Sequence, residues 1–376
     1  MAPLEQELGL SRAQVSLAFS LALLADGLAA YPVGRWIDRG HERRVMTAGS
    51  LLAGVSLVLL SAVNTVAGLY AVWTALGLAM AAVLYSPAFA VVTRRFAHDF
   101  RRAIITLTFL GGLASTVFIP LTAWLMSSLG WRLAVLCLAL LHLVVCAPLH
   151  AVVLRSAPRK PVLGAAETSG AHRASGVRDL IRSKPFLLIG LFVTLMMAVG
   201  VAIPAHMVSL LREHGLSETW VIAMPAAIGV IQVLGRVLMY LFEHRLDLHQ
   251  VNRWVPALIP LGLLILLLAP GLAAWQVTAV GLFVMLYGLG NGMLTIVRGT
   301  AIAQYVSRQH VATLNGALGV PQALARAGAP LLLGVMWSPH GGYQNGLWLM
   351  LALSLVGLAA LILAQAQSLI QHDTLD

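Results

Sequence analysis

Three charged residues stand inside long apolar stretches of the sequence: Asp26, Arg298 and Arg326. Removing a charge from water is costly, so a charged residue at such a position is a functional candidate. A guanidinium presents a planar fork of donors that fits a carboxylate at two points, and two such groups predict an anionic ligand. Asp26 could take up and release a proton, and so couple ligand movement to protons. The alternatives are structural: the arginines cap backbone carbonyls or pair with polar neighbours, and Asp26 pairs with an arginine or lies at the lipid edge.

Uncharged polar residues in the same stretches could complete the binding site, namely Gln232, Asn291, Asn315 and Gln322. Hydrogen bonding between neighbouring helices is the common role of such residues in membranes, and that alternative stays open. The glycine-rich stretch 288–292 has no preceding strand, so it predicts close helix packing rather than a nucleotide-binding loop. Neither metal-ligand spacing nor a Gly-x-x-x-x-Gly-Lys loop is present. We therefore expect no catalytic residues, no metal, no cofactor and no enzymatic activity.

The composition indicates that lipid surrounds the elements that carry these residues. Hydrophobic residues make up 59% of the chain, charged residues make up 10%, and the mean hydropathy is +0.87. A soluble domain carries about 25% charged residues, so too little polar surface remains here to cover a water-soluble globule. The net charge of +10 does not indicate a nucleic-acid partner, because the basic residues form short clusters between apolar stretches. This is the pattern of a polytopic membrane protein.

Eleven apolar runs are long enough to cross the hydrocarbon core, which takes about 20 residues in a helix. Backbone groups in lipid need internal partners, so every run is expected to be helical. The runs cover residues 13–37, 44–63, 67–93, 103–128, 131–154, 186–210, 217–241, 253–270, 275–305, 312–337 and 345–368.

The basic residues predict which side of the membrane each loop faces. Most of the 24 Lys and Arg residues lie at alternate ends of the runs, in clusters at 35–44, 94–102, 155–184 and 236–253 and at Arg308. The opposite side has only Arg12, Arg132 and Arg212. The side with the clusters is therefore predicted to be cytoplasmic.

One long polar segment, residues 155–185, divides the runs into two groups and predicts a cytoplasmic linker. We expect an N-terminal helix bundle over 1–154 and a C-terminal bundle over 186–376. Short sequences recur in the same order in both groups, which is typical of transporters with repeated bundles. They are Gly9-Leu10-Ser11 with Gly215-Leu216-Ser217, Gly34-Arg35 with Gly235-Arg236, Thr106-Leu107 with Thr313-Leu314, Pro120-Leu121 with Pro330-Leu331, and Gly130-Trp131 with Gly342-Tyr343.

The repeat also predicts that one helix is missing. An apolar run, 186–210, precedes the second Gly-Leu-Ser, but only eight residues precede the first. The first group then has five runs and the second has six. We expect a misplaced start codon or a fragment to be the cause, with a true eleven-helix protein as the alternative.

The loop after the first run reads Gly34-Arg35-Trp36-Ile37-Asp38-Arg39-Gly40-His41-Glu42-Arg43-Arg44. It resembles the signature loop of the major facilitator superfamily, Gly-x-x-x-Asp-Arg-x-Gly-x-Arg-Arg, between the second and third helices. The resemblance implies two six-helix bundles and a conformational latch that releases when the cytoplasmic side opens. The latch residues would be Gly34, Asp38, Arg39, Gly40, Arg43 and Arg44, with Asp38 at a helix end and paired with an arginine, and the arginines near lipid phosphates.

The segments 85–89 and 111–118 look like those of bacterial members, and the overall layout distantly resembles the monocarboxylate and oxalate/formate branch. That branch uses a basic residue of its eleventh helix for substrate, which by analogy favours Arg326. The resemblance implies a monomeric secondary transporter in the bacterial inner membrane. Its substrate would be a small organic anion bound by Arg326, Arg298, Asn291 and Gln322, with proton coupling through Asp26. The antiporter motif of the fifth helix is not matched around Pro120, so symport and antiport both stay open.

Other functions remain open at this point. Efflux of amphipathic compounds would need only a large apolar cavity. A membrane sensor or scaffold without transport would need a signalling partner on 155–185. A membrane-embedded enzyme would need a cluster of catalytic groups at one interface, and the sequence has none.

Overall fold

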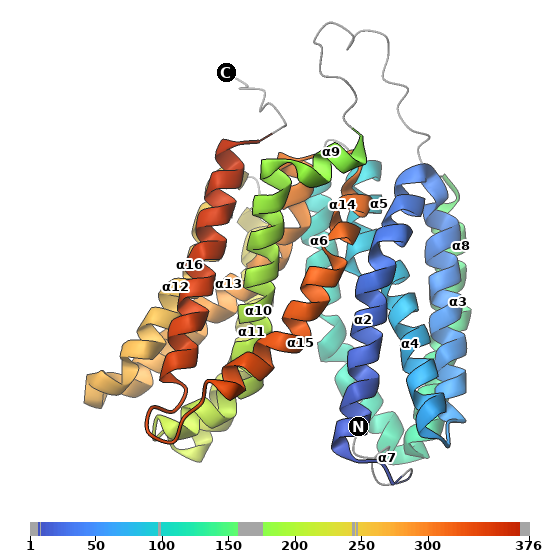
Figure 1. The fold of residues 1–376 in the computed structure, drawn as a ribbon. Coiled ribbons are helices and arrows are strands. Elements are labelled where there is room, and N and C mark those ends of the chain that lie inside the picture. Colours follow the sequence, from blue (N-terminus) through green and yellow to red (C-terminus); the bar gives the residue numbers. More distant parts are fainter. Residues whose placement is uncertain are drawn as a thin grey trace, which may run out of the picture. The chain divides into compact units, whose positions relative to one another are not determined.

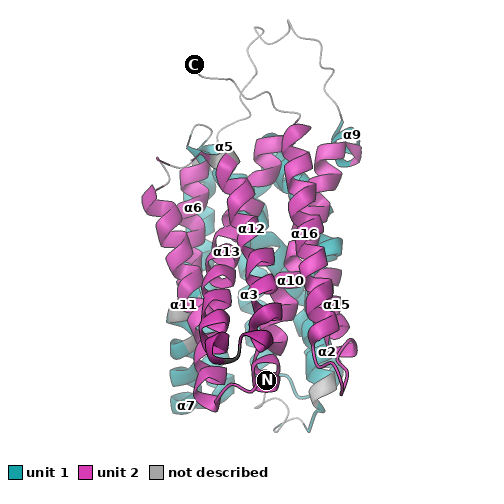
Figure 2. Ribbon diagram, turned by 90° about the vertical axis from the view of Figure 1, so that its left-hand side faces the viewer, with its two compact units in different colours: residues 1–100, 114–181, 308–323 teal, residues 101–113, 182–307, 324–376 magenta. Residues whose placement is uncertain are grey.

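The computed structural model describes residues 7, 9–96, 99–156, 176–242, 245 and 247–368. Nearly all of them are helical, and no β-sheet occurs within these ranges (Figure 1). They form two compact units (Figure 2). Unit 1 contains residues 1–100, 114–181 and 308–323, and unit 2 contains 101–113, 182–307 and 324–376. Compared with the predicted bundles, segments 101–113 and 308–323 are exchanged between the units, and the division into bundles stays a prediction.

Unit 1 is built from helices of the first half of the chain and one short helix of the second. A π-helical turn, η1 (Ile37–His41), connects the first two long helices. An apolar cluster that includes Val15, Leu60 and Leu69 packs the start of α2, the end of α3 and the start of α4 together. The helices are α2 (Arg12–Trp36), α3 (Glu42–Ser61), α4 (Val66–Val83), α5 (Tyr85–Arg95), α7 (Ala114–Leu141), α8 (Ala147–Val153) and α14 (Val311–Ala317).

Helix α13 of unit 2 has many buried residues and packs against α11 and α12. Its sequence places glycines at alternate positions, and each allows a neighbour to approach closely. A Cβ on Gly288 would lie 2.8 Å from Ile231 of α11, and one on Gly290 would lie 3.1 Å from Ile259 of α12. The prediction that stretch 288–292 packs helices is therefore confirmed. The helices are α10 (Lys184–Glu213), α11 (Glu218–Phe242), α12 (Leu248–Leu268), α13 (Gln276–Tyr305), α16 (Gln344–Ala366), and most of α6 (Phe100–Gly112) and α15 (Gly319–Val335).

Two of the predicted continuous runs are helices broken shortly before a proline, and run 103–128 is interrupted at Leu113, between α6 and α7. Run 67–93 breaks at Leu84, which has extended backbone angles, and run 312–337 bends by 40° at Leu318. In both cases a proline follows three residues later, Pro87 and Pro321. A proline lacks the N–H and its ring clashes with the carbonyl four residues back, so the helix restarts just before it. The apolar pattern alone does not reveal such breaks.

The number of crossings depends on how these breaks are counted. Among the described residues, eight helical stretches are long and apolar enough to cross a membrane, or nine if α14 and α15 form one bent crossing. The stretch Gln14–Ser61 has 48 residues and contains two predicted runs on either side of Gly40, whose φ is +88°. At about 1.5 Å per residue it is more than twice the length of one crossing. Gly130, with a φ of +76°, likewise separates the predicted runs 103–128 and 131–154.

A buried polar cluster connects α12, α13 and α16 in unit 2. The side-chain amide of Asn252 donates to the Tyr305 hydroxyl at 2.7 Å and to Gln304 Oε1 at 3.0 Å. Gln365 Nε2 also donates to the Tyr305 hydroxyl, at 3.2 Å, and accepts from Arg253 at 3.0 Å. The phenolic oxygen therefore receives two amide donors where water has little access.

We predict that Tyr305→Phe destabilises unit 2 by about 1–3 kcal/mol, because it leaves two buried amide donors without this acceptor. Thermal unfolding of the purified protein in detergent measures the effect. Tyr287→Phe is the matched control, since the buried Tyr287 hydroxyl makes a single long hydrogen bond, 3.4 Å to the Val199 carbonyl. Equal shifts in Tm for the two variants would contradict the prediction.

Candidate functional site

Arg298 and Asn291, two of the residues predicted to bind substrate, share one face of α13. They are seven residues apart, which is about two helical turns. This face lies against α10: Arg298 Nη1 is 3.7 Å from the sulfur of Met197, and a Cβ on Gly200 would lie 3.2 Å from Asn291 Oδ1. Both side chains are half-buried. The two residues therefore lie in the same helix interface of unit 2.

Arg326 lies in the middle of α15, also in unit 2, and its side chain is half-buried. Its positive charge acts on Arg298, so the two guanidinium groups lie near enough to repel each other. Like charges in a poorly solvated place repel each other, and an anion relieves that repulsion. Three of the four predicted substrate residues thus belong to unit 2.

Gln322 and Asp26 belong to unit 1. Gln322 lies one helical turn before Arg326 on α15 and is half-buried. Asp26 lies in the middle of α2, next to Gly27, and is also half-buried. A Cβ on Gly27 would lie 2.8 Å from the Ala323 side chain, so α2 passes closely by the start of α15 at this level. The roles of all five residues stay predictions.

Asp38 of the signature loop lies at the N-terminus of α14. Its carboxylate accepts hydrogen bonds from the backbone N–H of Thr313 at 2.7 Å and of Ala312 at 3.3 Å. These N–H groups begin a helix and have no partner within it, and the helix dipole favours a negative charge there. Only 7% of the Asp38 side chain is exposed. The loop between α2 and α3 therefore caps a helix about 275 residues further along the chain.

Arg94 of α5 completes this arrangement and was not singled out from the sequence. Its Nη2 donates to the Ile37 carbonyl at 2.7 Å and lies 3.4 Å from Asp38, and its Nη1 lies 3.2 Å from Glu42. The Glu42 side chain is only 1% exposed. From the sequence, Arg94 is predicted only to be one of the cytoplasmic basic residues. The signal that could have revealed this role is the acidic residue inside the loop motif. A carboxylate that is buried there needs a cationic partner.

The other predicted latch residues have different surroundings. Gly34 allows α2 to touch α14, because a Cβ at this position would overlap the Ala312 carbonyl. Gly40 has the left-handed φ that ends the turn. Arg43 Nε donates to the Ala151 carbonyl at 2.8 Å, which ties α3 to α8. Arg39 and Arg44 are exposed, as expected of side chains near lipid phosphates.

The sequence pattern assigns Arg236 to a cytoplasmic loop, but the structure places it inside a helix. It lies inside α11, half-buried, and its Nε donates to the Gly292 carbonyl of α13 at 3.3 Å. Its guanidinium occupies the space beside Gly112 of α6, which has no side chain. The position near the end of an apolar run made it look like a loop residue. Arg236 is thus a further half-buried arginine of unit 2, besides Arg298 and Arg326.

Comparison with known proteins gives consistent results. The sequence model of the Major Facilitator Superfamily matches residues 1–330. Monocarboxylate transporter 13 of Bos taurus is 28% identical over 325 residues, which cover 82% of this chain and 72% of that protein. The protein of the same name from Rattus norvegicus is 25% identical over 346 residues, covering 88% and 73%.

Solved structures of low sequence identity share the fold. A bacterial homologue of the iron transporter ferroportin, in an outward-facing state, has a TM-score of 0.70 at 15% identity and covers 96% of this chain and 92% of that one. The fucose:proton symporter FucP of E. coli has a TM-score of 0.72 at 12% identity and covers 98% and 93%. The predicted fold class, an all-helical membrane protein with the fold of the major facilitator superfamily, is therefore confirmed.

Proposed function

Since the chain belongs to the major facilitator superfamily, we propose that it moves a small organic anion across the membrane by alternating access. Membership makes it an integral, multi-pass membrane protein that transports a solute and is not an enzyme.

The pairing of Arg298 with Arg326 carries the choice of an anion. Two guanidinium groups that act on each other inside the helices of one unit favour a negatively charged ligand at that place. Asn291 on the same face of α13 could donate a further hydrogen bond, and Gln322 lies one turn away on α15. Two curated relatives are named monocarboxylate transporters, which supports a carboxylate as the recognised group.

We further propose that Asp26 couples transport to protons. It is a carboxyl group in the middle of a membrane-spanning helix, where protonation lowers the cost of leaving water. A structural neighbour of this fold is a fucose:proton symporter, so the fold accommodates proton coupling. We place the protein, as a monomer, in a bacterial inner membrane with the Arg-rich loops in contact with lipid.

Uptake into proteoliposomes tests the function. Lactate should accumulate when the outside is more acidic than the inside, and its uncharged amide, lactamide, should not. The pair has nearly the same size and differs in the charge that the arginines would recognise. Equal uptake of both compounds, or export of an amphipathic dye with no lactate uptake, would contradict the anion proposal and favour efflux of amphipathic compounds.

A further inference from the structure

The predicted outer end of each unit contains a carboxylate bonded to an indole N–H, here called a clasp. In unit 1 the Glu7 carboxylate accepts from Trp131 Nε1, and in unit 2 the Glu213 carboxylate accepts from Trp337 Nε1. Each glutamate stands two residues before a glycine with a left-handed φ, +62° at Gly9 and +73° at Gly215. In both clasps the two partners are 124 residues apart. The clasps are therefore the same element of the internal repeat.

This equivalence corrects one detail of the repeat. The sequence pattern pairs Trp131 with Tyr343, because each follows a glycine. The contacts pair Trp131 with Trp337 instead, since both bind the repeated glutamate. The residue after each tryptophan is then comparable, and it is Arg132 in the first clasp and Ser338 in the second.

In the first clasp a guanidinium occupies the site. Arg132 Nε lies 2.8 Å from Glu7 Oε1, and its central carbon lies 4.5 Å from the centre of the Trp131 ring. Further guanidinium donors reach the Val63 carbonyl at 3.2 Å and Asn64 Oδ1 at 2.9 Å. Hydrogen bonds from Trp131 and Arg132 lower the pKa of Glu7, so its carboxylate is charged at neutral pH. The clasp is thus a cation site filled by its own chain.

In the second clasp no guanidinium of the described residues takes the corresponding position. The Ser338 hydroxyl accepts from the Gly341 N–H at 3.1 Å, and the nearby Arg212 is engaged by Glu218 through bonds of 2.8 and 3.0 Å. Within the described part of the chain, no Lys or Arg nitrogen is within 4.0 Å of the Glu213 carboxylate.

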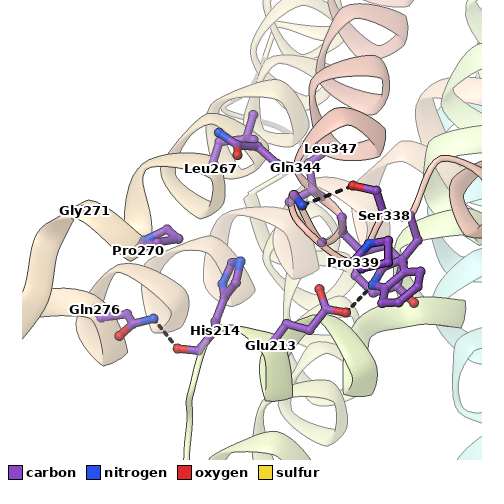
Figure 3. Close-up of a pocket in the computed structure, with 14 residues that line it drawn as sticks. Glu213, His214, Leu267, Pro270, Gly271, Gln276, Ser338, Pro339, Gln344 and Leu347 are labelled. Carbon is purple, nitrogen blue, oxygen red and sulfur yellow. Dashed lines mark hydrogen bonds between the residues drawn. The ribbon is translucent and has the colours of Figure 1, made fainter.

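A cavity of about 770 Å³ lies beside Glu213 instead (Figure 3). Its polar lining is suited to a cation, with one carboxylate, two aromatic rings and amide oxygens. Tyr343 is held in place by a hydrogen bond of 3.0 Å to His206. Burial lowers the pKa of His214, against the opposing effect of the Glu213 charge, so this ring is neutral at pH 7 and does not repel a cation. The lining includes Glu213, His214, Gln276, Trp337, Tyr343 and Gln344.

We propose that this cavity binds a small organic cation with a guanidinium or primary ammonium group, which takes the place that Arg132 has in the first clasp. The cation enters from the predicted outer side and contacts the Glu213 carboxylate and the Trp337 ring. The site is separate from the arginines of α13 and α15 and does not depend on the proposed anion substrate.

Calorimetric titration of the purified full chain in detergent tests the site. The probe is n-butylguanidinium, and n-butylurea is its uncharged control of the same shape. The wild type should bind the first and not the second. Glu213→Gln should weaken binding by roughly tenfold or more, the usual scale for losing a charge-assisted hydrogen bond. This variant keeps an acceptor for Trp337, and Tm reports whether it folds.

The repeat supplies the decisive variants. Ser338→Arg recreates the first clasp and should abolish binding, because the tethered guanidinium fills the site, whereas Ser338→Ala should bind like the wild type. Glu7→Gln, the matching change in the first clasp, should leave binding unchanged. The proposal is overturned if the wild type does not distinguish butylguanidinium from butylurea, or if Ser338→Arg and Glu213→Gln bind like the wild type.

Discussion

Replacing Arg326 by glutamine is expected to reduce lactate uptake by about 100-fold. A half-buried guanidinium that faces a desolvated carboxylate makes charge-assisted hydrogen bonds, and losing such a pair costs about 2–5 kcal/mol. Since every 1.4 kcal/mol is about tenfold, the lower part of that range gives about two orders of magnitude. The loss should appear as a higher KM in proteoliposomes, because the interaction binds the substrate itself.

Three further variants make the result specific. Arg326→Lys keeps the charge but loses the planar fork, so an intermediate loss is expected. Arg178→Gln removes an exposed arginine of α9 (Val177–Arg182) and should transport normally. Arg326→Glu reverses the charge, and normal lactate uptake by this variant would sink the anion proposal. The Tm of each variant separates loss of transport from loss of folding.

The sequence predicted the helices well because each had to be apolar over its whole length to lie in lipid. It also predicted that Gly288 to Gly292 pack helices and that Asp38 would meet a helix end. It missed the breaks at Leu84 and Leu318, because a break leaves the hydropathy unchanged. The feature that breaks each helix is a proline three residues later, which acts through local backbone geometry and not through hydropathy.

The partners of the polar residues were harder to predict. Arg94 meets Asp38 and Glu42 only because the fold brings together residues more than 50 positions apart. Arg236 looked like a loop residue because position along a run does not reveal which way a side chain points. The sequence does not reveal the clasp of Glu213 and Trp337, because Trp337 is not part of any of the short repeated sequences. Contacts between distant segments are set by packing, which one sequence does not show.

The second large effect is expected at the contact between Asp38 and α14. Asp38→Asn should raise the hydrogen-exchange rate of the amides in Val311–Ala317 by about 10- to 100-fold. The Asp38 carboxylate accepts hydrogen bonds from the backbone N–H groups of both Ala312 and Thr313. An asparagine has only one acceptor oxygen, and its NH₂ group would face one of these N–H donors. Losing a buried, charge-assisted bond costs about 1.5–3 kcal/mol, which corresponds to that range of rates.

The control is Asp99→Asn, which removes an exposed carboxylate near the start of α6 and should leave exchange unchanged. Glu42→Gln should have a smaller effect than Asp38→Asn, because Glu42 contacts Arg94 and not the α14 amides. Identical exchange in the Asp38 and Asp99 variants would mean that the carboxylate does not hold the helix.

A second route to the same state distinguishes a latch from general destabilisation. Gly34→Ala adds a Cβ that would overlap the Ala312 carbonyl, so it forces α2 away from α14 without touching the Asp38 charge. If the contact is a latch, both variants should expose the same α14 amides while the peptides of α12 and α13 in unit 2 keep their protection. Both should also slow lactate uptake, because a transporter that cannot hold one of its two states completes fewer cycles. Increased exchange throughout the chain would instead indicate that Asp38 only supports folding.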